Sequence, residues 1–167
     1  MQIIASGSLW GPEFLSWGVC MSVGHGRRGI QPDDGDPAAR CGEPPSRELL
    51  HGIEQFNARE YFECHETLEN IWKVEPGPIR TLYKGILQVG VGCLHLLRAN
   101  YKGATIKLQS GADYLEPYAP RCMGVEVGQL IADARVLRAR LVELGPEHFR
   151  EVDLALLPQV KLAPGAE

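Results

Sequence analysis

From residue 46 onward, apolar side chains recur every three or four positions, which is the period of amphipathic helices. The first predicted helix begins at Ser46, a residue type that caps helix N-termini. Its apolar positions are Leu49, Leu50, Ile53 and Phe56. Further helices are predicted over residues 60–73, 78–99, 104–115 and 125–143. No segment alternates as a strand does, so the pattern predicts an all-α fold, a compact bundle of about five helices.

The segment 78–99 is apolar around most of its circumference. These apolar positions include Leu82, Ile86, Leu87, Val89, Leu94 and Leu96. A polar seam with a spacing of seven residues follows one side and consists of Thr81, Gln88 and His95. Gly85 and Gly92 lie beside the seam and leave room for close backbone approach. A helix that is apolar nearly all round is expected at the centre of the bundle.

The chain divides into three parts by composition. Residues 1–45 are rich in Gly, Pro and Asp and have neither a helical nor a strand period, so we expect a disordered or irregular leader. Residues 46–145 are expected to form the helical-bundle domain, and residues 146–167 a C-terminal extension. An interaction tail is the alternative interpretation of the leader, and Met21 is an alternative start of translation.

Charge and hydropathy narrow the classes of partner. The chain of 167 residues carries a net charge of −4 and no long run of Lys or Arg. We therefore expect neither nucleic acid nor an anionic membrane as a partner. No apolar stretch reaches the roughly 18 residues that span a bilayer, and the start of the chain lacks the basic segment of a secretory signal. A cytoplasmic location is expected.

The cysteines give no metal or redox motif. Five are widely scattered, and no two are separated by two residues. They are Cys20, Cys41, Cys64, Cys93 and Cys122. An odd count without an export signal is typical of reduced thiols, and the two in predicted helices, Cys64 and Cys93, are expected in the core rather than as nucleophiles.

The stretch 61–73, YFECHETLENIWK, holds the candidate chemistry. On a helical wheel with Tyr61 at zero, His65 lies at about 40° and Glu69 at about 80°, on one edge of an apolar arc. That arc contains Tyr61, Cys64, Leu68, Ile71 and Trp72. The opposite side carries Glu63, Glu66, Asn70 and Lys73. Tyr61 and Trp72 are expected in the core, with a pocket lining as the alternative.

Residues four apart on a helix have Cβ atoms about 5–6 Å apart, so His65 and Glu69 could hold one divalent metal ion. A catalytic metal needs a further protein ligand. His95 of the third helix is the candidate, as a third ligand or as a proton carrier, with Gln88 as an orienting neighbour. A buried His65–Glu69 pair without metal is the alternative. His51 and His148 are expected to be solvated.

Two stretches, FNAREYFECHETLENIW and LQVGVGCLHLLRANYKGA, resemble the bacterial and archaeal family catalogued as domain of unknown function 309. The family motif is a histidine, three residues, a glutamate, two residues and then Trp or Tyr, which here are His65, Glu69 and Trp72. Other matching positions are Phe56, Asn57, Tyr61, Glu66, Asn100, Gly103 and Ala104. The resemblance covers about residues 47–118.

The chain departs from the family at Ala58-Arg59 and at Ala99, where relatives often have glycine. Both departures concern turn geometry rather than the suspected site. The resemblance implies an all-helical fold of undetermined activity, for which metal binding through the histidine and the glutamate has been suggested.

Three functions follow as alternatives. The first is a metal-dependent hydrolase, in which a divalent ion on His65, Glu69 and His95 acidifies a bound water. Glu66 could act as its base only if the helix turned it inward. The second is a non-catalytic helical interaction module, and the third is a homodimer in which the seam of residues 78–99 packs against its copy. No 34-residue repeat supports a tetratricopeptide array.

Overall fold

The computed structural model describes residues 35–166, so most of the expected leader, including Met21, lies outside the described residues. The five α-helices of this part are α2 (Arg47–Asn57), α3 (Tyr61–Val74), α4 (Arg80–Leu97), α5 (Tyr101–Leu115) and α6 (Val127–His148). Short 3-10 helices are η2 (Pro37–Arg40), η3 (Glu116–Tyr118), η4 (Phe149–Glu151) and η5 (Leu154–Leu156). No strand forms among residues 35–166, which confirms the all-α prediction.

Helix boundaries follow local capping. Ser46 caps α2, because its side chain accepts a hydrogen bond from the Leu49 amide at 3.1 Å. Helix α5 begins three residues before the predicted position, since the Asn100 side chain accepts from the Gly103 amide at 2.8 Å and so starts the helix at Tyr101. In α6, the positive φ of 72° at Gly145 interrupts the helix near its predicted end.

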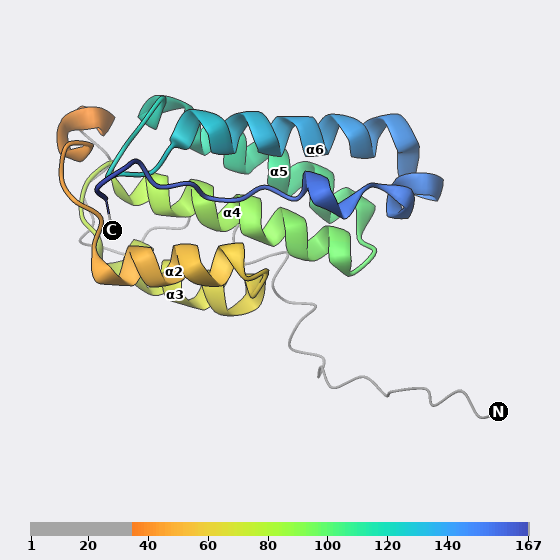
Figure 1. Ribbon diagram of the computed structural model, residues 1–167, viewed down its shortest axis with the longest axis horizontal. Coiled ribbons are helices and arrows are strands. Elements are labelled where there is room, and N and C mark those ends of the chain that lie inside the picture. Colours follow the sequence, from red (N-terminus) through yellow and green to blue (C-terminus); the bar gives the residue numbers. More distant parts are fainter. Residues whose placement is uncertain (1–34, 167) are drawn as a thin grey trace, which may run out of the picture. The chain divides into compact units, whose positions relative to one another are not determined.

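Helix α4 lies in the middle of the bundle, as its apolar circumference predicts (Figure 1). It packs against α3 on one side and α5 on the other. The contact with α5 is close because glycines lie on it from both helices. A Cβ atom on Gly92 would lie 2.8 Å from Leu108 Cγ, and one on Gly111 would lie 2.8 Å from the Val89 nitrogen. The predicted role of Gly92 in close backbone approach is therefore confirmed.

Two helices end in a left-handed residue that is not glycine. After α2, Arg59 has φ 64°, and after α4, Ala99 has φ 57°. The amide of the next residue then bonds back to the helix, from Glu60 to the Gln55 carbonyl at 2.9 Å and from Asn100 to the His95 carbonyl at 2.8 Å. This pattern is the Schellman motif, in which glycine is the usual residue.

The end of the expected leader is attached to the bundle. Cys41 forms a disulfide with Cys122, 81 residues away in sequence, so the expectation of reduced thiols is wrong for this pair. The Met123 amide also donates to the Cys41 carbonyl at 2.8 Å. Long-range covalent and hydrogen bonds therefore hold residues 35–45, and a local sequence pattern does not reveal such bonds.

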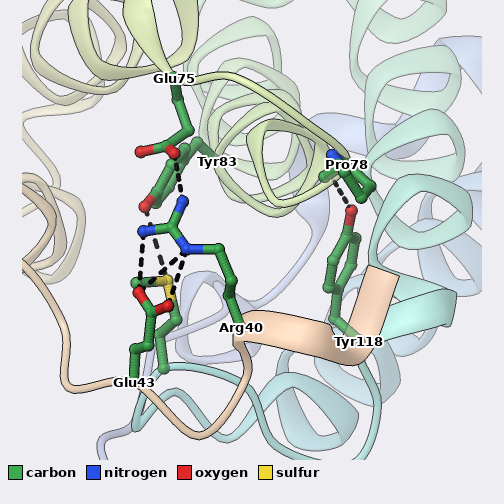
Figure 2. A network of polar contacts seen from close by, with 7 residues as sticks. Arg40, Glu43, Glu75, Pro78, Tyr83 and Tyr118 are labelled. Atoms are coloured by element: carbon green, nitrogen blue, oxygen red, sulfur yellow. Dashed lines mark hydrogen bonds and ion pairs between the residues drawn. The ribbon is translucent and has the colours of Figure 1, made fainter. Parts of the chain in front are cut away.

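Arg40 connects this segment to the turn between α3 and α4 (Figure 2). Its guanidinium donates to both carboxylate oxygens of Glu43, at 2.8–3.0 Å, and also to Glu75 just after α3. On the other side of the turn, the Tyr118 hydroxyl donates to the Pro78 carbonyl. These contacts fix the connection that brings α3 alongside α4.

The C-terminal extension packs back on the bundle through Asn57. The Asn57 side chain donates to the Val160 carbonyl at 2.9 Å and accepts from the Val160 amide at 2.8 Å. A paired backbone contact of this kind gives the family-matching Asn57 a structural role. Within residues 35–166, no helix combines the length and the apolar character that crossing a membrane requires.

Candidate functional site

Helix α3 places its residues as the wheel predicts. His65 is buried, with 4% of its surface exposed, beside the buried Tyr61 and Leu68. The Glu69 side chain is 29% exposed, whereas Glu66 points to solvent. Glu66 is therefore not placed to act as a catalytic base in the interior, in agreement with its position on the helical wheel.

The surroundings of His65 and Glu69 carry positive charge. Glu69 forms an ion pair with Lys73 at 3.1 Å. The pKa of His65 is lowered, first because burial disfavours the charged imidazolium and then because Lys73 and Lys107 repel it, while Glu69 opposes the shift. Lys107 belongs to α5, so charges of both α3 and α5 influence His65.

His95 is held by the turn that follows α4. Because the Asn100 oxygen accepts from the Gly103 amide, the Asn100 side-chain nitrogen is left to donate to His95 Nδ1, at 3.2 Å. This places the imidazole proton on Nε2. A Cβ on Gly103 would lie 2.7 Å from His95 Cγ, so the glycine makes room for the ring. Burial, with Lys107 and Arg98, lowers the pKa of His95, and the ring is neutral near pH 7.

This tautomer disfavours His95 as a metal ligand. A metal on Nε2 would need that nitrogen deprotonated and Nδ1 protonated, yet the Asn100 amide donates to Nδ1 and cannot accept. Among residues 35–166, no three His, Cys, Asp or Glu side chains are grouped as a metal site requires. The ligand set His65, Glu69 and His95 stays a prediction that these contacts do not support.

Polar and charged side chains instead gather where α4 is flanked by α3 and α5. Successive positions on α4 place Lys84, Gln88 and His95 within about 40° of one another, between the sides that contact α3 and α5. We call this surface the polar face. Its members are His65, Glu69 and Trp72 of α3, Arg80, Lys84, Gln88 and His95 of α4, and Lys107, Ser110 and Tyr114 of α5.

Direct contacts join these helices across the polar face. The Ser110 hydroxyl of α5 donates to the Gln88 oxygen of α4 at 3.4 Å. The Lys84 ammonium lies 4.2 Å from the centre of the Tyr114 ring and 6.0 Å from that of Trp72. The Arg80 guanidinium lies 4.9 Å from the Trp72 ring centre. Cation–π contacts of this kind hold a cation in place without neutralising it.

Three cations of the polar face lack a carboxylate partner among residues 35–166. They are Arg80, Lys84 and Lys107, whereas Lys73 nearby is neutralised by Glu69. Cations that lie close together repel one another. An anion that binds among them relieves this repulsion, so its binding is favourable. The face therefore carries a net positive charge on a chain whose total is −4.

Other predicted site residues belong to the core. Tyr61 is 2% exposed and its ring packs edge-on against Phe56, with ring centres 5.4 Å apart. Burial raises the pKa of the Cys64 and Cys93 thiols to about 12, which fits the prediction that neither is a nucleophile. Trp72 is half-buried and lies at the edge of the polar face, so for Trp72 the alternative of a site lining is favoured over the core.

The sequence did not lead us to expect Arg80, Lys84 or any residue of α5 in the polar face. Lys84 falls within the arc of the seam of Thr81, Gln88 and His95, and this wheel position was a usable signal. On α5, Lys107, Ser110 and Tyr114 share one side at spacings of three and four residues. Nothing local shows that this side faces His65, because that depends on how α5 packs on α4.

A five-helix bundle with a polar face on its central helix is the class of protein that these observations define. Residues 49–106 match the family described as "Domain of unknown function (DUF309)", so the predicted family resemblance is confirmed over this segment. The match includes His65, Glu69 and His95 but ends just before Lys107.

The chain is also similar to "Uncharacterized protein YpuF" of Bacillus subtilis (strain 168), with 35% identity over 90 residues. The aligned part covers 52% of each protein, so the chain spans about half the length of this curated relative. No solved structure matches the chain.

Proposed function

We propose that the polar face binds a small organic anion through a carboxylate or phosphate group. The observation that carries this proposal is the presence of three cations, Arg80, Lys84 and Lys107, without a carboxylate partner in the described part of the chain. Trp72 and Tyr114 orient two of them, and Ser110 adds a hydroxyl group. Charge-assisted hydrogen bonds from such groups are the usual means of recognising carboxylates and phosphates.

The same charges favour an anion over a divalent metal ion as the ligand of the polar face. A dication beside His65 would meet the repulsion of Lys73 and Lys107, with Glu69 already paired. The metal-dependent hydrolase is thus the less favoured function. Elemental analysis of protein purified without chelator, beside His65→Ala and Glu69→Gln, distinguishes the two. A bound metal in the wild type that both variants lose would favour the hydrolase over our proposal.

Anion binding is tested by titrating the purified chain with inorganic phosphate, acetate and pyruvate, followed by calorimetry or amide chemical shifts. Lys84→Met removes one cation and keeps the length of the side chain. We expect it to weaken binding by about ten- to a hundredfold, because a hydrogen bond to a charged group contributes about 1.5–3 kcal/mol. Binding should also weaken as salt is raised.

The matched control is Lys102→Met, at an exposed lysine of α5 that is not part of the polar face. It should leave the affinity unchanged. Equal affinities of the two variants, or binding of none of the three anions by the wild type, would contradict the proposal. The interaction module, the homodimer and the cytoplasmic location stay predictions, for which light scattering and fractionation are the direct measurements.

A further inference from the structure

Arg80 and Lys84 form a compact pair of cations at one end of the polar face. They are four residues apart on α4, so their Cβ atoms are about 5–6 Å apart. Both lie over one ring of α3, because the Arg80 guanidinium is 4.9 Å and the Lys84 ammonium 6.0 Å from the Trp72 ring centre. The Lys84 ammonium also lies 4.2 Å from the Tyr114 ring centre on α5. Aromatic rings of two different helices therefore position this pair.

The two positive charges of the pair are not neutralised within the part of the chain that the structure describes. Helix α4 itself contains no Asp or Glu. The carboxylates within three residues of Trp72 or Tyr114 all have partners of their own. These partners are Lys73 for Glu69, Arg40 for Glu75, Gln109 for Asp113 and Arg135 for Glu116. Because like charges four residues apart on a helix repel, an anion bound to both cations is stabilising.

A ligand that matches this pair carries two negative charges on one small group. A carboxylate has one negative charge, whereas the phosphate group of a monoester has about −1.5 to −2 at pH 7 and three acceptor oxygens. A guanidinium can donate two parallel hydrogen bonds to phosphate oxygens, and an ammonium acts as a compact point charge. Since the aromatic rings already hold both side chains, binding costs less side-chain entropy than it would with two free side chains.

We propose that Arg80 and Lys84 bind the dianionic phosphate group of a phosphate monoester or of free phosphate. This proposal rests on the proposed function, and it assigns which of the two anion classes the polar face binds and at which end. Lys107 lies toward the other end of the face, one turn of α5 beyond the contact between Ser110 and Gln88.

The test is calorimetric titration of the full chain, at pH 7.5 and constant ionic strength, with methyl phosphate, dimethyl phosphate, inorganic phosphate and acetate. Methyl phosphate and dimethyl phosphate differ by one methyl group and one negative charge. We expect methyl phosphate to bind at least about tenfold more tightly than dimethyl phosphate or acetate, because its second charge meets the second cation. Inorganic phosphate distinguishes the two sources of the group: equal affinity indicates free phosphate and weaker affinity a monoester, and both results support the proposal.

Variants locate the site on the polar face. Arg80→Gln and Lys84→Met should each reduce the preference for methyl phosphate over dimethyl phosphate to a few-fold at most. The matched controls are Arg47→Gln, at an exposed arginine of α2, and Lys102→Met, at an exposed lysine of α5. Both controls should keep the preference of the wild type.

The outcomes separate this proposal from the one on which it depends. Equal affinities for methyl phosphate, dimethyl phosphate and acetate overturn the phosphate dianion and leave the anion-binding function intact. A preference that persists in both Arg80→Gln and Lys84→Met overturns the assignment to this pair. Binding of none of the four anions overturns both proposals. The comparison of ligands on the wild type needs no variant, so it decides the question even if a variant fails to fold.

Discussion

At the scale of single residues, the backbone conformation explains two positions at which this chain departs from the family that it resembles. The family resemblance implies glycine near residues 59 and 99, and in the structure Arg59 and Ala99 take left-handed conformations. A non-glycine residue there brings Cβ close to a carbonyl oxygen, which costs about 1–2 kcal/mol. The non-glycine residues at these two positions therefore lower the stability of the fold, and neither position is a member of the polar face.

Ala99→Gly should relieve this strain. We expect the free energy of unfolding to rise by about 1 kcal/mol, because glycine takes a positive φ without penalty but adds entropy to the unfolded chain. Urea denaturation measures the change. Ala139→Gly, at an exposed helical position of α6, is the control and should lower stability by about 1 kcal/mol. A loss of stability at both positions would contradict the assignment of residue 99.

The buried histidines predict the response to acid. Burial lowers the folded-state pKa of His65 and His95 below the ordinary value of 6.5, so the unfolded chain binds more protons than the folded one. The free energy of unfolding should then fall as the pH drops below about 6.5. In urea titrations between pH 7.5 and 5.5, His65→Gln should show a smaller loss than the wild type. The same change at the exposed His51 serves as the control, and an identical pH dependence for His65→Gln and the wild type would exclude this role.

At the scale of elements, the contact between α4 and α5 positions the two halves of the polar face. Glycines allow the backbones to approach closely on one side, and this approach brings Ser110 within hydrogen-bond distance of Gln88. The position of Lys107 relative to His65 depends on the same contact. A change of spacing between these helices should therefore affect stability and anion binding together.

Gly111→Ala tests this dependence. The added Cβ would lie 2.7 Å from Val89 Cγ2 and 2.8 Å from the Val89 nitrogen, so the helices must separate. We expect a loss of about 1–3 kcal/mol in the free energy of unfolding and weaker binding of phosphate or pyruvate. Gly42→Ala, where a Cβ would have no heavy atom within 4 Å, should change stability by no more than about 0.5 kcal/mol. Equal effects of the two changes would argue against close α4–α5 packing.

At the scale of the whole described chain, a disulfide and an arginine hold residues 35–45 against the bundle. Cys41 is bonded to Cys122. Arg40 bridges Glu43 and Glu75 (Figure 2), and these three side chains are partly exposed. Exposed ion pairs contribute little to stability, whereas a cross-link over 81 residues strongly restricts the unfolded chain. The covalent bond is the dominant attachment.

Cys41→Ser with Cys122→Ser should lower the free energy of unfolding by about 2–4 kcal/mol, by the usual effect of losing a disulfide. Urea denaturation without reductant measures it, and mass spectrometry of unreduced peptides checks the pairing. Adding reductant should bring the wild type to the stability of the double variant. A wild type that is insensitive to reductant, with free thiols at both positions, would show that the bond does not form in solution.

The sequence by itself determined the helices, their approximate ends and the buried edge of α3. The period of 3.6 residues predicts which side of a helix is buried, as at His65. A cap bonds to an amide only a few residues away, as Ser46 does to Leu49, so it can be predicted from the local sequence. The family resemblance likewise rests on a contiguous stretch of motif positions.

Only the tertiary structure decided which groups share a site. It brought Lys107 of α5 to the side of His65 of α3, and it joined Cys41 to Cys122. Such pairings depend on helix packing and chain reversal over tens of residues, for which the local period carries no information. For the same reason, the local pattern could not give the sign of the charge around His65, because Lys73 and Lys107, which contribute to it, belong to different helices.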